Sequence, residues 1–167
     1  MSLDGYIAQP NDDLTFLSIV EQEGEDYGYA DFIETIDTVI LGRKTFDWVR
    51  NHTDEIPYAD KETYVITRTA NPSIGKISFY TGDIKDLVIH LKNMNGGNIF
   101  LVGGSEIVYA LQKEKLNDEF YISIIPVLLG EGINLFIDGL PEQRLTLINS
   151  KQFSSGLVQL HYKISDS

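Results

Sequence analysis

The chain of 167 residues has no cysteine and only three histidines, His52, His90 and His161. Without cysteine there is no disulfide framework, no thiolate zinc site and no cysteine nucleophile. The histidines lie far apart in the sequence, which argues against a metal site built from imidazoles. We therefore expect no bound metal.

Basic residues are also scarce, because 13 Lys and Arg stand against 25 Asp and Glu, for a formal net charge of −12. Nucleic-acid binders need a basic face for the phosphates, so we expect no nucleic-acid partner. A small anionic ligand stays compatible with this charge, since a few nearby cations outweigh acids at a distance.

Long apolar segments are missing as well. No run reaches the roughly 20 residues of a membrane helix, and the N-terminus lacks the pattern of a signal peptide. We expect a cytoplasmic protein with no membrane partner. The chain is 43% hydrophobic and of even composition, without repeats or a long linker. That is typical of a single domain over residues 1–167.

The hydrophobic pattern alternates between strand-like and helix-like segments. Short continuous apolar runs, typical of strands buried on both faces, occur at residues 39–41, 64–66 and 99–102. Helices are expected at about residues 30–36, 44–50 and 83–94, and from about Ser105. This alternation predicts βαβ crossovers and a parallel sheet with helices on both faces.

The helix over residues 83–94 has the clearest signals. Asp83 can cap its first turn, and Asn95-Gly96-Gly97 ends it. Its apolar stripe consists of Ile84, Leu87, Val88, Leu91 and Met94. The helix from Ser105 is expected to face inward with Ile107, Val108 and Leu111.

The last third of the chain is rich in strand signals, at residues 119–129, 145–153 and 157–164. Ser154-Ser155-Gly156 predicts a hairpin between the last two. The expected class is α/β, a mainly parallel mixed sheet with an antiparallel C-terminal hairpin. The hairpin has apolar residues on both faces, which indicates that something covers it, such as a second copy of the chain.

A first candidate ligand site is Leu41-Gly42-Arg43-Lys44-Thr45, where a buried strand ends in glycine and a helix begins with two cations and a hydroxyl. A helix N-terminus with added positive charge suits a phosphate. The alternative is that Gly42 is only a turn residue and the cations are solvated.

A second candidate is Val102-Gly103-Gly104-Ser105-Glu106, again a strand, a glycine pair and a helix. Two glycines let the backbone approach a pyrophosphate without a Cβ clash. The third glycine of the dinucleotide fingerprint is missing, so a simple tight turn stays open. Two such turns in one sheet imply an extended ligand such as a dinucleotide.

Two further features have both a functional and a structural interpretation. Thr67-Arg68, after the strand at residues 64–66, could hold a ribose 2′-phosphate and so favour NADP over NAD, or form a solvent-facing loop. Asp4, in an Asp-Gly turn, could be a turn residue or a proton donor. One acid in the acidic segment from Glu21 to Asp31, or the nearby Glu34, could protonate a substrate nitrogen, the rest being solvated or capping.

Four segments in this order carry a resemblance: residues 2–8 (Ser-Leu-Asp-Gly-Tyr-Ile-Ala), 41–46, 102–106 and 126–136. Over nearly its whole length the chain resembles the dihydrofolate-reductase-like family, in the branch shared with the reductase domain of the bifunctional riboflavin-pathway deaminase–reductase. The resemblance implies a mainly parallel sheet with an antiparallel C-terminal strand, and NADPH as hydride donor.

By position, the resemblance implies roles for particular residues. The phosphate turn corresponds to Gly42, Arg43, Lys44 and Thr45, and the 2′-phosphate loop to Thr67 and Arg68. The glycine pair at the pyrophosphate and the helix behind it correspond to Val102, Gly103, Gly104, Ser105, Glu106 and Ile107. Ile7 and Ala8 resemble the edge of the nicotinamide pocket, and Asp26 resembles the helix carboxylate that binds the pterin ring.

The chain departs from the family in two ways. The family's first strand normally has several residues before the Ser-Leu-Asp-Gly motif, so this strand is expected to be shortened or its start incomplete. The zinc deaminase domain of the bifunctional enzyme needs His, Glu and paired Cys. This chain has no cysteine, and at most it corresponds to the stand-alone reductase half.

The expected function is an NADPH-dependent reductase that transfers a hydride to a small heterocyclic substrate. The resemblance implies the riboflavin-pathway 5-amino-6-(5-phosphoribosylamino)uracil or a pterin such as dihydrofolate, with Asp4, Asp26 or an ordered water supplying the proton. The alternative is a non-catalytic nucleotide-binding or sensor protein on the same fold. A homodimer, as in riboflavin-type relatives, is a further expectation.

Overall fold

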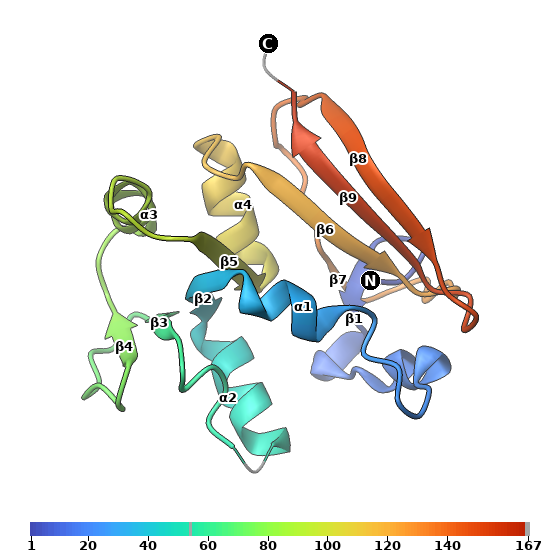
Figure 1. Cartoon of the computed structure of the whole chain (residues 1–167), viewed down its shortest axis with the longest axis horizontal. Helices are drawn as coiled ribbons and strands as arrows, with labels where there is room; N and C mark the ends of the chain where they lie inside the picture. Colours follow the sequence, from blue (N-terminus) through green and yellow to red (C-terminus); the bar gives the residue numbers. More distant parts are fainter. Residues whose placement is uncertain (54, 166–167) are drawn as a thin grey trace. The chain divides into compact units, whose positions relative to one another are not determined.

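The computed structural model describes residues 1–53 and 55–165, which form two compact units (Figure 1). Unit 1 consists of Met1–Tyr27 and Asn117–Ser167, and unit 2 of Gly28–Leu116. The prediction of a single domain over residues 1–167 stays a prediction. Among the described residues, no helix has the length and apolar character needed to cross a membrane.

Unit 2 is built on a parallel sheet. Its strands lie in the order β4-β3-β2-β5 and all run parallel. Their bounds are β2 Ile36–Gly42, β3 Glu62–Ile66, β4 Ile77–Tyr80 and β5 Asn98–Gly103. The strands expected from the short apolar runs are therefore confirmed, with β4 added at one edge.

Helices cover both faces of this sheet. They are α1 Tyr29–Glu34, α2 Arg43–His52, α3 Ile84–Lys92 and α4 Ser105–Lys113. Successive side chains of β2 point to opposite faces of the sheet, so neighbouring residues join different hydrophobic cores. Val39 and Leu41 pack with Phe46 of α2, whereas Ile40 packs with Val88 of α3 and Ile107 of α4.

The helix ends differ in detail from the prediction. Asp83 caps α3 as expected, because its side chain accepts a hydrogen bond from Lys85 N at 2.7 Å. The helix ends at Lys92, so Met94 lies beyond the apolar stripe and is 57% exposed. Ile36, expected in a helix, is the buried first residue of β2, and α1 stops at Glu34.

Unit 1 is mostly antiparallel. Strands β6 Glu119–Ile124, β9 Val158–Ile164 and β8 Leu145–Gln152 form one sheet, and β1 Tyr6–Ala8 pairs with β7 Ile133–Asn134. Two 3-10 segments, η1 Pro10–Asp12 and η2 Thr15–Val20, follow β1. The predicted hairpin is confirmed, since Phe153 N donates to Leu157 O at 3.0 Å across it.

The long strand expected over residues 119–129 is shorter in the structure. β6 ends at Ile124, and Ile125 forms only an isolated bridge to Ser2. Pro126 follows, and proline has no N–H to continue a ladder. The remainder of the expected strand is a loop.

Candidate functional site

The two glycine turns lie side by side at one edge of the parallel sheet. Leu41 of β2 is in register with Gly103 of β5. A Cβ placed on Gly42 would lie 3.1 Å from Ile107 Cδ1 and 3.7 Å from Gly104 N. Two turns separated by about 60 residues therefore form one site, which we call the glycine cradle, residues 42–45 and 102–107.

Two helices begin at the glycine cradle. Gly42 and Gly104 are the N-cap residues of α2 and α4, and neither cap has a side-chain hydrogen bond. The N–H groups in the first turn of a helix lack intrahelical acceptors and carry the positive end of the helix dipole. Two such helix ends next to each other suit a ligand with more than one phosphate group.

The backbone of the second turn is open to a ligand. Gly103 has φ +121°, a conformation that favours glycine, and the Gly103–Gly104 peptide bond is cis. A Cβ on Gly104 would have only Thr45 Oγ1 within 4 Å, at 3.7 Å. The positions that a Cβ would occupy on Gly103 and Gly104 are therefore open, as close approach of a phosphate requires.

Arg43, the first residue of α2, is held by two contacts. Its Nε donates to both carboxylate oxygens of Asp47, at 2.9 and 2.8 Å, and its Cζ lies 5.3 Å from the centroid of the Phe79 ring. Sequence reasoning did not single out Asp47 or Phe79. The spacing of four residues on a helix could have indicated Asp47, whereas the contact with Phe79 depends on where β4 lies.

Thr67 and Arg68 follow β3 at the same edge of the sheet. Ile66 is in register with Gly42, so the chain leaves β3 level with the first glycine turn. Thr67 N donates to Tyr80 O at 3.0 Å, and Thr67 Oγ1 accepts from Thr69 N at 3.2 Å. The side chain of Arg68 is exposed. The structure thus brings both candidate phosphate turns and the candidate 2′-phosphate loop to one edge.

The other residues of the glycine cradle have different surroundings. Val102 and Ile107 pack against the cores on opposite faces of the sheet and so fix the turn between them. Lys44 and Glu106 are exposed, and Ser105 is half-buried. Because a carboxylate repels phosphate, Glu106 can contribute to a phosphate site only through its backbone N–H.

Asp4 lies in unit 1 and is fully engaged in hydrogen bonds. Its carboxylate accepts from Ser2 Oγ at 2.6 Å, from Gly130 N at 2.8 Å and from Leu129 N at 3.0 Å. The Ser2 hydroxyl and then the Gly130 N–H hold the pKa of Asp4 below its ordinary value of 3.8. An ionised carboxylate has no proton to donate, so these contacts favour the structural interpretation of Asp4.

The other unit 1 candidates are Ile7, Ala8 and Asp26. Ile7 and Ala8 belong to β1, where Ala8 is buried and in register with Ile133 of β7. Asp26 is exposed and lies in the loop between η2 and α1. The resemblance implied a carboxylate on a helix, so the local structure at Asp26 differs from that expectation.

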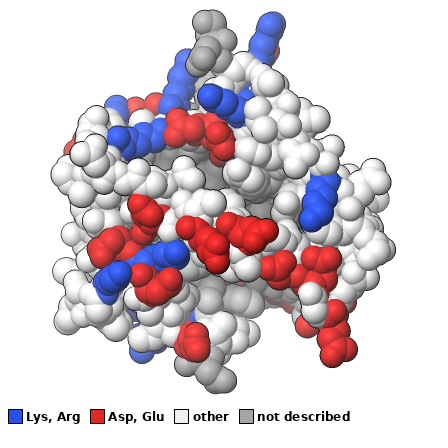
Figure 2. All heavy atoms as spheres, viewed as in Figure 1, with Lys and Arg blue, Asp and Glu red and all other residues white. Residues whose placement is uncertain are grey.

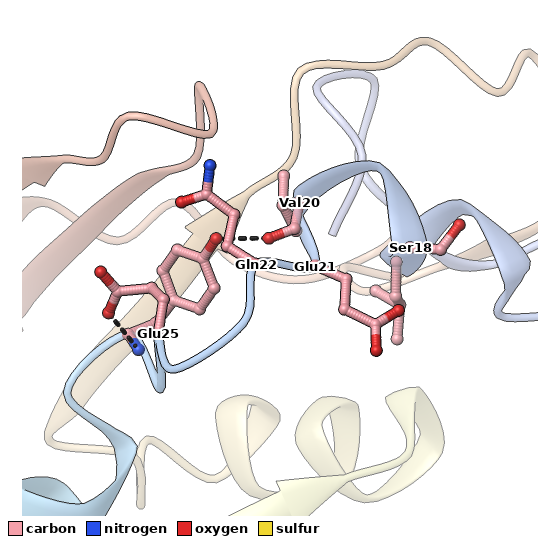
Figure 3. Close-up of a pocket in the computed structure, with 7 residues that line it drawn as sticks. Ser18, Val20, Glu21, Gln22 and Glu25 are labelled. Atoms are coloured by element: carbon pink, nitrogen blue, oxygen red, sulfur yellow. Dashed lines mark hydrogen bonds between the residues drawn. The ribbon is translucent and has the colours of Figure 1, made fainter.

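Close to Asp26, a hollow of about 310 Å³ lies in unit 1 (Figure 3). Tyr27 Oη donates to Val20 O, and Glu25 Oε1 accepts from Tyr27 N at 2.8 Å. The lining residues are Leu17, Ser18, Val20, Glu21, Gln22, Glu25 and Tyr27. Such a carboxylate-lined hollow suits hydrogen-bond donors rather than phosphates.

The surface charge matches the composition. Figure 2 shows acidic side chains spread over the face in view, with Lys and Arg in small groups between them. Within residues 1–53 and 55–165, no group of three or more His, Asp or Glu is placed to hold a metal ion.

Comparison with known proteins gives two relatives of almost the same length. The chain is 42% identical to the uncharacterized protein YwjB of Bacillus subtilis, over 97% of this chain and 92% of that protein. It is 35% identical to the uncharacterized protein YyaP of the same organism, over 97% of this chain and 90% of YyaP.

Solved structures share the fold. A Shewanella sp. PV-4 protein, assigned by its name to riboflavin biosynthesis, has a TM-score of 0.88 at 29% identity, over 99% of this chain and 96% of that one. The Thermotoga maritima diaminohydroxyphosphoribosylaminopyrimidine deaminase/5-amino-6-(5-phosphoribosylamino)uracil reductase has a TM-score of 0.71 at 12% identity, over 98% of this chain but 54% of that protein.

The RibD C-terminal domain family matches residues 1–159, which confirms the branch expected from the four motifs. The parallel sheet, the helices on both its faces and the antiparallel hairpin agree with the dihydrofolate-reductase-like fold of the solved structures. The chain belongs to the RibD C-terminal domain family.

Proposed function

We propose that the protein is an NADPH-dependent reductase of a small heterocyclic substrate. The observation that carries the proposal is the glycine cradle, in which two glycine turns, the second of them open, and two helix N-termini meet at one edge of the parallel sheet. This position, outside the carboxyl ends of parallel strands, is where α/β sheets bind nucleotides.

The residues at this edge fit the phosphates of NADPH. The backbone N–H groups after Gly42 and Gly104 suit the pyrophosphate, since a Cβ on Gly104 would occupy the approach to them. Arg43, Thr67 and Arg68 follow β2 and β3 and suit the ribose 2′-phosphate. NAD lacks that phosphate, so these residues favour NADPH.

When bound, NADPH supplies a hydride to an electrophilic carbon of the substrate. The chain's own part is to hold the dinucleotide in one orientation and to let a proton reach the substrate heteroatom. Asp4 is ionised and engaged, so in this proposal it anchors the loop at Leu129 and Gly130 rather than donating the proton. Asp26 or an ordered water remains the candidate donor.

The substrate proposed first is 5-amino-6-(5-phosphoribosylamino)uracil, which the Thermotoga protein's name gives as the compound it reduces. Dihydrofolate is the second substrate. The competing function is a non-catalytic nucleotide-binding or sensor protein, which the glycine cradle would serve equally well. Substrate-dependent oxidation of NADPH separates catalysis from binding alone.

The test begins with titration of the protein with NADPH and NADH by calorimetry. We expect NADPH to bind in the micromolar range and NADH more weakly. Arg68→Ala should weaken NADPH binding about tenfold or more, because a direct charged contact to phosphate is lost, with little effect on NADH. Arg50→Ala, which removes an exposed arginine from the last turn of α2, is the matched control.

Absorbance at 340 nm then follows NADPH oxidation with each of the two substrates. Oxidation that requires one substrate supports the reductase. Binding of NADPH with no oxidation by either substrate supports the non-catalytic function. If neither nucleotide binds below millimolar concentration, the proposal fails.

A further inference from the structure

We infer that Asp47 is a positioning residue for cofactor choice: it holds Arg43 so that the guanidinium presents its terminal Nη groups to the 2′-phosphate. This inference rests on the proposed function. It assigns to a carboxylate, a group that repels phosphate, a role in binding one.

The contact between the two side chains leaves the useful end of Arg43 available. Both Asp47 oxygens accept from the same atom, Nε, at 2.9 and 2.8 Å. A guanidinium binds phosphate best through paired N–H groups that lie in one plane. These two bonds to Asp47 use Nε alone, so the N–H groups at the far end of the guanidinium, shared by its two Nη atoms, are left for a phosphate.

Phe79 restrains the guanidinium from a second direction. Arg43 Cζ lies 5.3 Å from the centroid of the Phe79 ring. That ring packs edge-on against Phe46, with centroids 5.6 Å apart, and Phe46 is fully buried. Arg43 therefore rests on a ring that is itself fixed by the core, while Asp47 restrains the same group through Nε.

These contacts place Arg43 near the candidate 2′-phosphate loop. Phe79 lies on β4, two strands away from β2, to which Arg43 is joined through Gly42. β3 lies between these two strands, and its Val65 is in register with both Leu41 of β2 and Phe79 of β4. Thr67 and Arg68 follow directly on β3, the strand across which Arg43 reaches Phe79.

The opposite effect, repulsion of the phosphate by Asp47, is expected to be smaller. The side chains of Arg43 and Asp47 are 40% and 45% exposed, so water and salt screen a charge that does not touch the ligand. Losing the orientation of Arg43, in contrast, affects the side chain that contacts the phosphate directly. Immobilising a long side chain on binding has a free-energy cost that corresponds to about 3- to 10-fold in affinity.

The test measures the dissociation constants of NADPH and NADH for wild type, Asp47→Ala, Asp47→Asn and Arg43→Ala. We expect Asp47→Ala to weaken NADPH about 3- to 10-fold and to leave NADH within twofold. Asp47→Asn keeps an oxygen acceptor for Nε and should stay within about twofold of wild type for both nucleotides. Arg43→Ala should lose at least as much NADPH preference as Asp47→Ala.

A matched control is Glu114→Ala, which removes the acid of another exposed ion pair in unit 2, Lys85–Glu114 at 2.6 Å. It should leave the ratio of the two dissociation constants unchanged. Wild type and all four variants, Glu114→Ala included, are also titrated with 2′,5′-ADP and with 5′-ADP. The difference between these two ligands isolates the contribution of the 2′-phosphate.

Each outcome is decisive. If Asp47→Ala leaves NADPH binding unchanged, strengthens it or weakens both nucleotides equally, Asp47 does not position Arg43, and the inference is overturned while the reductase proposal stands. If wild type binds neither nucleotide, the proposed function fails first and the inference fails with it.

Discussion

Gly103 and Gly104 are adjacent, but they need to be glycine for different reasons. Gly103 has φ +121°, which strains any side chain. Gly104, the N-cap of α4, has φ −77°, which every residue adopts, and a Cβ there would make one ordinary contact. The fold therefore requires glycine at position 103 but not at position 104, where the absence of a Cβ fits the proposed approach of a phosphate.

This distinction gives a prediction for Gly104→Ala. The variant should fold with a melting temperature close to that of wild type, because the added methyl meets only Thr45 Oγ1 at 3.7 Å. It should bind NADPH about tenfold or more weakly, because the methyl holds the phosphate away from the N–H groups and one charge-assisted hydrogen bond is worth that much. Thermal melts and calorimetry measure the two effects.

Gly96→Ala is the control for Gly104→Ala, since Gly96 precedes β5 at its other end and a Cβ there would contact only Asp37 Oδ2 at 3.5 Å. Gly96→Ala should change neither the melting temperature nor the affinity for NADPH much. Wild-type affinity for NADPH in Gly104→Ala would show that the space over the cradle is not a ligand site.

Among the elements, β1 follows a turn whose carboxylate, Asp4, bonds to the loop after β6. Asp4 accepts from Leu129 N and Gly130 N, and Ser2 Oγ, which donates to Asp4, accepts from Tyr6 N at 2.9 Å. The turn before β1 is thereby joined to the loop after β6. Hydrogen bonds to Asp4 thus satisfy two N–H groups in the loop that replaces the end of the strand predicted over residues 119–129.

Asp4 should make the stability of wild type depend on pH at the acid end. Its folded pKa lies below the ordinary value of 3.8, so its contribution is fully present above that pH and is lost as the pH falls through the folded pKa. Asp4→Asn cannot titrate, and its melting temperature should fall less than that of wild type between about pH 4 and pH 2.

Melting temperatures from pH 7 to pH 2 measure this difference, with Glu23→Gln, an exposed acid in the η2–α1 loop, as the control. The control should follow the wild-type curve. Identical acid slopes for wild type and Asp4→Asn would contradict the anchoring role of Asp4.

Most elements follow from local signals in the sequence. The stripe Ile84, Leu87, Val88 and Leu91 and the cap at Asp83 place α3 within a residue or two. The two differences from the prediction have separate causes. Met94 has the right spacing for the stripe, yet α3 ends before it at a local cap, where Asn93 Nδ2 donates to Ile89 O at 2.9 Å. Ile36 pairs with Asn98 in the sheet instead of continuing a helix, which only the tertiary structure decides.

At the scale of the whole molecule, the edge strand β8 exposes several large apolar side chains. Leu145, Leu147 and Ile148 are 43%, 50% and 53% exposed. An exposed apolar edge strand indicates a surface that a partner covers. We propose that a second copy of the chain covers β8 in a homodimer.

Light scattering at micromolar concentration tests the dimer, which should have twice the chain mass of 18.8 kDa. Ile148→Lys should shift the mass toward one chain, because a buried lysine opposes association. Leu128→Lys, at an exposed leucine in the loop that follows β6, is the matched control and should leave the dimer intact. A wild-type mass of one chain would exclude the dimer.

The sequence by itself determined the class of fold, the family and the residue types of the cradle. These depend on local information: apolar periodicity, glycine at strand ends, and four motifs in a fixed order. Only the tertiary structure decided that Gly42 and Gly104 meet, that Arg43 rests on Phe79, and that Asp4 is an anchor. Each of these depends on strand order or on a contact between residues far apart in the chain, and no local pattern encodes such distances.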